Sequence, residues 1–296
     1  MVDVVLTPAR ALQTGTDVPG RVAFRQGGSA ANTARWLARL GARSTLVCAV
    51  GRDPEGRALV AELEGDGVRV RARRVAHERT GRIGVLVAPG GERSFVADRA
   101  AADRLGPEDL AASSFRADLL HLPAYSMLGD QLGRAGRRAI ELARDAGALI
   151  SLDLSSVGPL LAEGRRAALR LVREMAPDVL FATRVEAEAI AARRDVASLA
   201  DVAGIVVIKH GRAGASVLAG RGAARLAFDV ATSPLEATDT TGAGDAFDAG
   251  FLIAWLMAGP EPAGARARPA TLRRAVLAGH AAAARQLGST PKELAL

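Results

Sequence analysis

Apolar and polar residues follow two different periods along this chain, and the periods predict a regular succession of strands and helices. Short apolar runs typical of buried strands cover residues 45–50, 118–122, 148–152, 179–181 and 205–209. Stretches with helical spacing cover residues 53–65, 131–146, 163–175, 243–257 and 271–287, and another helix is expected to begin at residue 186. Strands that alternate with helices form largely parallel sheets with helices on both faces, so we expect an α/β fold.

Three strand-like segments break this alternation. Residues 21–26, 82–87 and 93–97 read as strands, and no helix separates them from their neighbours. The last two are joined by a proline-glycine turn at residues 89–91. These three segments therefore lie outside the regular strand–helix alternation. Neither a repeat nor a linker divides the 296 residues, which are expected to form a single domain.

Composition indicates a globular protein and argues against several kinds of partner. Apolar residues make up 49% of the chain and charged residues 24%, and arginine supplies nearly all of the positive charge behind the net +7. The arginines of residues 69–74 alternate with apolar residues and have no aromatic neighbours, which favours a half-exposed strand over a nucleic-acid surface. Cys48 is the only cysteine, so no intramolecular disulfide and no cysteine metal site is expected.

The expected localisation follows from the targeting and membrane segments that the sequence does not contain. It shows neither a secretory signal nor an apolar run long enough to span a membrane, so we expect a cytoplasmic protein with no membrane partner. It also lacks the Walker pattern of P-loop ATPases and the Gly-x-Ser-x-Gly elbow of hydrolases.

Candidate chemistry lies in the small-residue segment at residues 239–247, which runs directly into an apolar helix. The first backbone N–H groups of a helix have no internal partner, and the helix dipole is positive there. Glycine and alanine at Gly242, Ala243 and Gly244 would let an anion approach those groups, so the segment predicts a phosphate site. Asp245 beside it could take a proton from an attacking hydroxyl, or could simply cap the helix.

This segment resembles the C-terminal signature of the PfkB family of carbohydrate kinases, and residues 27–34, 36–42 and 50–56 resemble the N-terminal signature of that family. The similarity extends over almost the whole chain. It implies a ribokinase-like three-layer α/β/α fold with a mostly parallel central sheet and a small β lid formed by residues of about 10–27 and 79–99. It also implies an ATP-dependent kinase that phosphorylates a hydroxyl of a small sugar or sugar acid of the ribose, fructose or 2-keto-3-deoxygluconate type.

The resemblance assigns roles to matching residues. Asp245 would be the catalytic base, and Gly242, Ala243 and Gly244 would cradle the transferring phosphoryl group. Sugar hydroxyls would be bound by Asp3 and Asn32, with Gly28 allowing close approach; Asn32 could instead serve a turn or cap at a helix start.

The nucleotide and metal sites are implied in the same way. Glu186 matches the glutamate that organises Mg²⁺ through water, or could be a solvated first-turn glutamate, and Thr183 stands where the family has asparagine. Lys209, Gly211 and Gly214 resemble the nucleotide loop, with Lys209 able to reach a phosphate. His280 matches a position near adenine, or packs on its helix. Asp239 matches a ligand of a monovalent cation in some relatives, although the short loop after the last helix makes activation by that cation doubtful.

Two further expectations concern the N-terminus and the function. Asp3 stands where the family has a sugar-binding aspartate, but the strand that normally precedes it is missing, so we expect a truncated first strand. The runner-up function is a nucleoside kinase of the same family, disfavoured by the scarcity of aromatic residues, and a third is a non-catalytic ligand-binding relative. The lid strands could pair across a homodimer.

Overall fold

The structure is a computed structural model, and it describes residues 1–88, 92–191, 195–220, 225–235, 237, 239–258, 265–290 and 292–295. The chain divides into two compact units. The first unit contains Met1–Leu105, Ala237–Thr241 and Leu287–Leu296, and the second contains Gly106–Glu236 and Gly242–Gln286. The expected turn at residues 89–91 lies outside the described residues. No helix in the described part of the chain is both long and apolar enough to cross a membrane.

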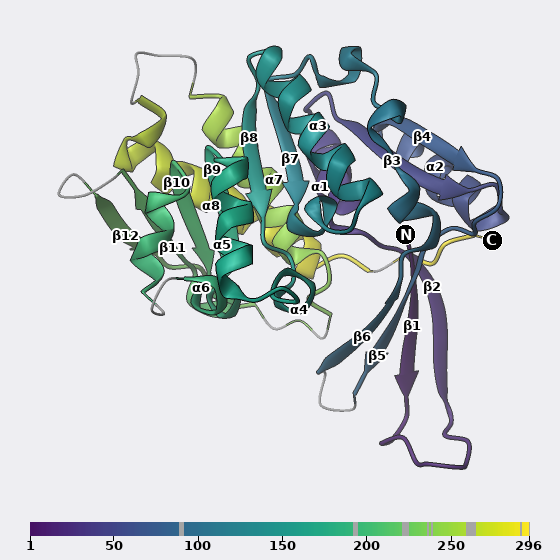
Figure 1. Ribbon diagram of the computed structural model, residues 1–296. Coiled ribbons are helices and arrows are strands. Elements are labelled where there is room, and N and C mark those ends of the chain that lie inside the picture. The colour runs from purple at the N-terminus through teal and green to yellow at the C-terminus, as the bar shows by residue number, and fades with distance from the viewer. Residues whose placement is uncertain are drawn as a thin grey trace. The chain divides into compact units, whose positions relative to one another are not determined.

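The first unit contains two sheets. A four-stranded sheet has the order β2-β1-β5-β6, in which β1 pairs with β5 in parallel and the outer pairs are antiparallel (Figure 1). Its strands are β1 (Val2–Pro8), β2 (Gly20–Gln26), β5 (Arg82–Val87) and β6 (Arg93–Asp98). The other sheet pairs β3 (Thr45–Gly51) with β4 (Arg69–Val75) in parallel.

Two helices of the first unit connect and cover these strands. Helix α1 (Ser29–Arg39) packs Ala31 and Ala34 into a small core with Leu46, Leu63 and Val68. Helix α2 (Pro54–Gly65) begins at the Asp53-Pro54 pair, where the Asp53 carboxylate accepts a hydrogen bond from the Gly56 N–H at 2.8 Å. Proline is tolerated at the first helical position because its missing N–H would have no partner there.

The second unit is built on a six-stranded sheet of order β12-β11-β10-β9-β8-β7. Neighbours from β7 to β10 are parallel, and β11 and β12 are antiparallel additions at the far edge. The parallel strands are β7 (Leu119–Pro123), β8 (Leu149–Asp153), β9 (Val179–Thr183) and β10 (Ile205–Lys209), and the added pair is β11 (Ala215–Ala219) and β12 (Leu226–Val230). The carboxyl ends of β8, β9 and β10 therefore meet at one edge, where ligands bind in open α/β sheets.

Helices cover both faces of this sheet, with α5 and α6 on one face and α7 and α8 on the other (Figure 1). The alternating side chains Val179 and Phe181 face α7, where they pack with Phe251 and Trp255. The helices are α3 (Gln131–Asp145), α4 (Val157–Leu160), α5 (Arg165–Met175), α6 (Arg184–Ile190), α7 (Ala243–Leu256) and α8 (Pro269–Leu287). This layer anchors the N-terminal end of α7 beside the ends of the parallel strands.

Most expected strands and helices are present within a few residues of their predicted bounds. The segments at 21–26, 82–87 and 93–97 do form one small sheet, and the arginine-rich segment at 69–74 is a strand. Strand β1 was not predicted as part of that small sheet, and β11 and β12 were not predicted at all. Strands β1, β11 and β12 are only five to seven residues long. Their pairing depends on partners distant in the sequence, so the local pattern did not reveal it.

Candidate active site

The segment of residues 242–245, called here the anion turn, opens helix α7. Gly242 is the N-terminal cap and adopts a left-handed conformation with φ 74°, which costs glycine little and any other residue more. Its carbonyl accepts the Ala246 N–H at 2.9 Å. Gly242 has no side chain with which to cap the first N–H groups of α7, and Asp245 stands half-buried in the first helical turn. The turn thus has the geometry of an anion site with a carboxylate beside it.

Beside the anion turn lie three ionisable residues, called here the Lys209 cluster: Lys209, Asp153 and Asp248. The ammonium of Lys209 donates hydrogen bonds to Asp153 at 2.5 Å and to the two carboxylate oxygens of Asp248 at 3.0 and 3.2 Å. A Cβ atom placed on Gly244 would lie 3.4 Å from this Nζ atom. Lys209 was expected to reach a nucleotide phosphate, and the structure pairs it with these two carboxyl groups.

The charges of the cluster depend strongly on one another. Burial alone would lower the pKa of Lys209, but the neighbouring carboxyl groups raise it above its usual value. Burial would raise the pKa of Asp153, yet the Lys209 ammonium and hydrogen bonds from Lys209 and Asp248 hold it well below its ordinary range. Burial and the Asp153 charge raise the pKa of Asp248 well above its usual value. These pKa directions favour the charged forms of Lys209 and Asp153 and the uncharged form of Asp248.

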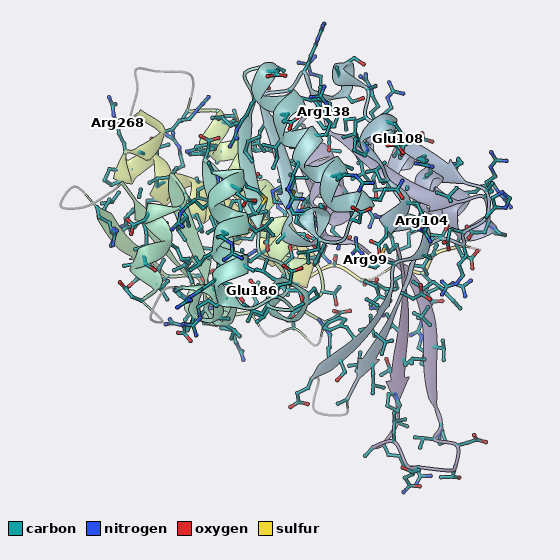
Figure 2. The ribbon with its side chains drawn as sticks, in the orientation of Figure 1. Arg99, Arg104, Glu108, Arg138, Glu186 and Arg268 are labelled. Atoms are coloured by element: carbon teal, nitrogen blue, oxygen red, sulfur yellow. The ribbon has the colours of Figure 1, made fainter. Side chains whose placement is uncertain are left out.

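Thr183 and Glu186 form a capping box at the start of α6, where Figure 2 labels Glu186. The Thr183 hydroxyl accepts the Glu186 N–H at 3.3 Å, and Glu186 Oε2 accepts the Thr183 N–H at 2.7 Å. Burial and the nearby Asp153 charge raise the pKa of Glu186. The reading of Glu186 as a solvated first-turn residue does not fit its 8% exposure.

These residues fit magnesium held mainly by nucleotide phosphates. Mg²⁺ keeps several waters and is usually bound through one or two carboxylates together with substrate phosphates. Glu186 supplies such a carboxylate at the edge where β9 ends, with one oxygen committed to the capping box. No group of three or more His, Cys, Asp or Glu residues gathers closely enough to hold a metal within the described part of the chain.

The expected nucleotide loop and His280 meet at the end of β12. Gly211 and Gly214 both have positive φ values, of 58° and 101°, and a Cβ atom on Gly214 would overlap the Val230 carbonyl. The Nε2 atom of His280 lies 3.4 Å from the same carbonyl, and its ring meets Phe247 edge-on with centroids 5.2 Å apart. Burial lowers the pKa of His280, which favours a neutral ring. The structure therefore brings Gly214 and His280 together from separate parts of the sequence.

In the first unit, the residues expected to bind the acceptor also lie close together. The Asp3 carboxylate is buried against Gly27, where a Cβ atom would overlap it. Gly28 caps α1 with φ 100°, and its carbonyl accepts the Asn32 N–H at 3.0 Å. Asn32 is therefore in the first turn of α1, and it is half-buried. Gly27 belonged to the recognised motif but was not named as a site residue, and its close approach to Asp3 explains why glycine stands there.

Asp239 is held by two arginines of the first unit. Arg25 donates to Oδ2 at 2.7 Å and Arg93 donates to Oδ1 at 2.7 Å. The Thr241 N–H also donates to Oδ1, at 2.9 Å. Both oxygens of the carboxylate that was considered for a monovalent cation thus accept hydrogen bonds from protein groups.

Sequence reasoning did not name Asp153, Asp248, Arg25 or Arg93. A usable signal existed for Asp248, because an aspartate inside the apolar helix 243–257 must find a partner or remain neutral. The arginines carried no such signal, because 39 basic residues are spread along the chain.

Comparison with known proteins matches this chain to a family. The model of the pfkB family carbohydrate kinases matches residues 1–290. An ATP-dependent ribose-1-phosphate kinase from Halopiger xanaduensis is 35% identical, over 79% of this chain and 74% of that protein. A fructokinase from Klebsiella pneumoniae is 31% identical, over 80% of this chain and 78% of that protein.

Solved structures show the same relationship. The crystal structure of adenosine kinase from Sinorhizobium meliloti superposes with a TM-score of 0.78 at 25% identity, covering 100% of this chain and 94% of that one. The expected ribokinase-like α/β fold is thereby confirmed. This protein belongs to the pfkB family of carbohydrate kinases and is an ATP-dependent phosphotransferase.

Proposed function

We propose that this protein transfers the γ-phosphate of ATP to a hydroxyl group of a small sugar or sugar acid, of the ribose, fructose or 2-keto-3-deoxygluconate type. The observation that carries the proposal is the anion turn, in which a glycine with φ 74° opens a 14-residue helix and a carboxylate stands in the first turn. A carboxylate beside an anion site is electrostatically unfavourable unless it acts on the anion's reaction partner, and a general base does so.

In this mechanism the protein positions groups and stabilises charge. Asp245 accepts the proton of the attacking hydroxyl, while the backbone N–H groups of Gly242, Ala243 and Gly244 stabilise the transferring phosphoryl group. Glu186 would hold Mg²⁺ bound with ATP through water, and the ion would supply charge neutralisation at the phosphates. Thr183 stands where the family has asparagine, and its hydroxyl is engaged in the capping box, where it accepts the Glu186 N–H.

Substrate binding is divided between two groups of residues. Asp3 and Asn32 bind hydroxyl groups of the acceptor, and Gly28 lets it approach the backbone. Gly211 and Gly214 hold the nucleotide against the backbone, with His280 near the base. The positive φ values of three of these residues support the assignment, because a side chain there would be strained.

The test is a coupled assay of ADP release against a panel of sugars, sugar acids, phosphorylated sugars and nucleosides. We expect turnover with a sugar, and we expect Asp245→Asn to reduce kcat by at least about a thousandfold while ATP still binds. Asp145→Asn, an exposed aspartate at the end of α3, is the matched control and should leave kcat unchanged. Full activity of Asp245→Asn would overturn the assignment of the base.

A nucleoside kinase is the second candidate, because the matching adenosine kinase structure covers the whole chain. Turnover with nucleosides alone would establish it. ATP or sugar binding with no turnover on any acceptor would instead support a ligand-binding relative.

A homodimer through the four-stranded sheet remains part of the proposal. Val22, Phe95 and Val96 lie on its strands and are 58%, 64% and 75% exposed. Sedimentation equilibrium of the protein and of a Phe95→Asp variant would test this: a dimer that the variant dissociates supports it, and a monomeric wild type contradicts it.

A further inference from the structure

The Lys209 cluster joins three elements at the edge of the sheet where the proposed chemistry takes place. Asp153 ends β8, Lys209 ends β10, and Asp248 lies in α7, one turn beyond Asp245. Lys209 Nζ contacts both carboxyl groups within 3.2 Å. The first two turns of α7 are therefore tied to the ends of two parallel strands through a single ammonium.

The cluster is unusually deep for three ionisable groups. The side chains of Lys209, Asp153 and Asp248 are 12%, 7% and 0% exposed. Removing charges from water is unfavourable, and replacing a buried ion pair by apolar residues is often neutral or stabilising. Stability alone therefore gives little reason for a charged cluster at this place, and a functional reason is needed.

That reason is the position of the ammonium relative to the anion turn. Nζ would be 3.4 Å from a Cβ atom on Gly244, so the ammonium lies directly beside the backbone of the anion turn. The Lys209 side chain is only 12% exposed, so the field of its ammonium is weakly screened by water. The Asp153 carboxylate opposes this field, while burial and the Asp153 charge raise the pKa of Asp248.

We propose that Lys209 is a positioning residue for phosphoryl transfer: it holds the anion turn in place through Asp248 and supplies a fixed positive charge beside the turn. The inference rests on the proposed kinase function and adds to it a residue that need not touch the nucleotide. It predicts that loss of the ammonium lowers kcat more than it weakens ATP binding, because the phosphoryl group carries its developing charge in the transition state.

The first test is a charge-matched double variant. Lys209→Met alone would leave Asp153 as a buried unpaired carboxylate and could fail to fold, so Asp153→Asn is combined with it. We expect kcat to fall by about tenfold or more, with KM for ATP within about threefold of wild type, in a protein that is folded at the assay temperature. Lys292→Met is the control, because Lys292 is the only other lysine and its side chain is 83% exposed.

The second test measures the NMR signal of the Lys209 ammonium directly. With ¹⁵N-labelled lysine the chain yields only two side-chain signals, those of Lys209 and Lys292. When the non-hydrolysable analogue AMP-PNP is added with Mg²⁺, we expect the Lys209 signal to shift and the Lys292 signal to remain in place. A purely structural ion pair would not respond in this selective way.

The outcomes separate the two proposals. A selective Lys209 shift together with reduced kcat in the double variant supports the inference. If calorimetry shows AMP-PNP binding but the Lys209 signal stays in place and the double variant keeps wild-type kcat, the inference is wrong and the proposed function stands. If AMP-PNP does not bind and no acceptor is phosphorylated, the proposed function fails, and the inference that rests on it fails too.

Discussion

Arg93 and Asp239 are joined by a hydrogen bond of 2.7 Å between the Arg93 guanidinium and Oδ1 of the carboxylate. Arg25 binds the other oxygen at the same distance, so two fixed cations hold one carboxylate. Burial would raise the pKa of Asp239, but hydrogen bonds from Thr241 and the charge of Arg93 lower it, and the group is therefore ionised. A carboxylate neutralised in this way has little attraction left for a dissolved cation.

The first prediction is that potassium does not activate the enzyme. We expect turnover to be unchanged when KCl is replaced by tetramethylammonium chloride at equal ionic strength, since Arg25 and Arg93 already supply positive charge to Asp239. The measurement is kcat in the two salts. A several-fold loss of kcat that K⁺ alone restores would show that Asp239 serves a monovalent cation despite its arginine partners.

The second prediction concerns the backbone of the anion turn. Gly242→Ala forces a residue with a Cβ atom into φ 74°, so we expect a loss of about 1–2 kcal/mol of unfolding free energy or a rearranged turn. In either case kcat should fall, because the N–H groups no longer converge on the phosphoryl group. Chemical denaturation and steady-state kinetics measure the two effects.

Gly65→Ala is the matched control for that variant. Gly65 ends α2, does not have a positive φ, and has no atom within 4 Å of its Cβ position. Alanine there should leave kcat unchanged and leave stability equal or slightly higher. If Gly242→Ala behaved in the same way, the left-handed cap would not matter to the site.

The third prediction separates the two roles of Glu186. Glu186→Gln keeps a side chain that can complete the capping box with Thr183 but removes the charge. The pKa of Glu186 is raised in the folded protein, so its ionised form costs stability above the usual pKa of a glutamate; the neutral variant should be at least as stable at neutral pH. The Mg²⁺ concentration for half-maximal activity should rise about tenfold.

The outcome that contradicts this is an unchanged magnesium dependence. Glu186 would then be only a helix cap, and Glu186→Ala would lower stability without a specific effect on the metal. Titration of activity with Mg²⁺ at saturating ATP distinguishes the two cases.

The fourth prediction is a pH dependence from His121 on β7. Its Nδ1 atom is 2.9 Å from the Ser151 hydroxyl, and burial, together with the Lys209 charge, lowers its pKa to about 4. Because the unfolded chain takes up a proton near pH 6.5 and the folded protein only near pH 4, stability falls as the pH falls between these values. The loss is on the order of 3 kcal/mol when the shift is converted at about 1.4 kcal/mol per pKa unit.

His121→Gln should flatten that slope, because glutamine can still bond to Ser151 but does not titrate. Urea denaturation between pH 4 and 7 measures it, with the exposed His77→Gln as the control that retains the wild-type slope. An unchanged slope in His121→Gln would assign the pH dependence to other groups.

Local chemistry in the sequence was enough to predict much of this protein. The anion turn could be read because a left-handed glycine, a helix start and an adjacent carboxylate lie within four consecutive residues. The βα alternation was readable for the same reason, since burial on both faces of a strand gives a short continuous apolar run.

Tertiary structure alone decided which charges meet. Lys209 finds Asp153 and Asp248 at separations of 56 and 39 residues, and Asp239 finds Arg25 at a separation of 214. Nothing in the sequence marks one aspartate as the partner of one basic residue among 39, because ion pairs form between whichever groups the packed strands and helices bring within hydrogen-bonding distance. The sequence therefore predicted a phosphate-binding turn at residues 242–245, and the fold decided which cation lies beside it.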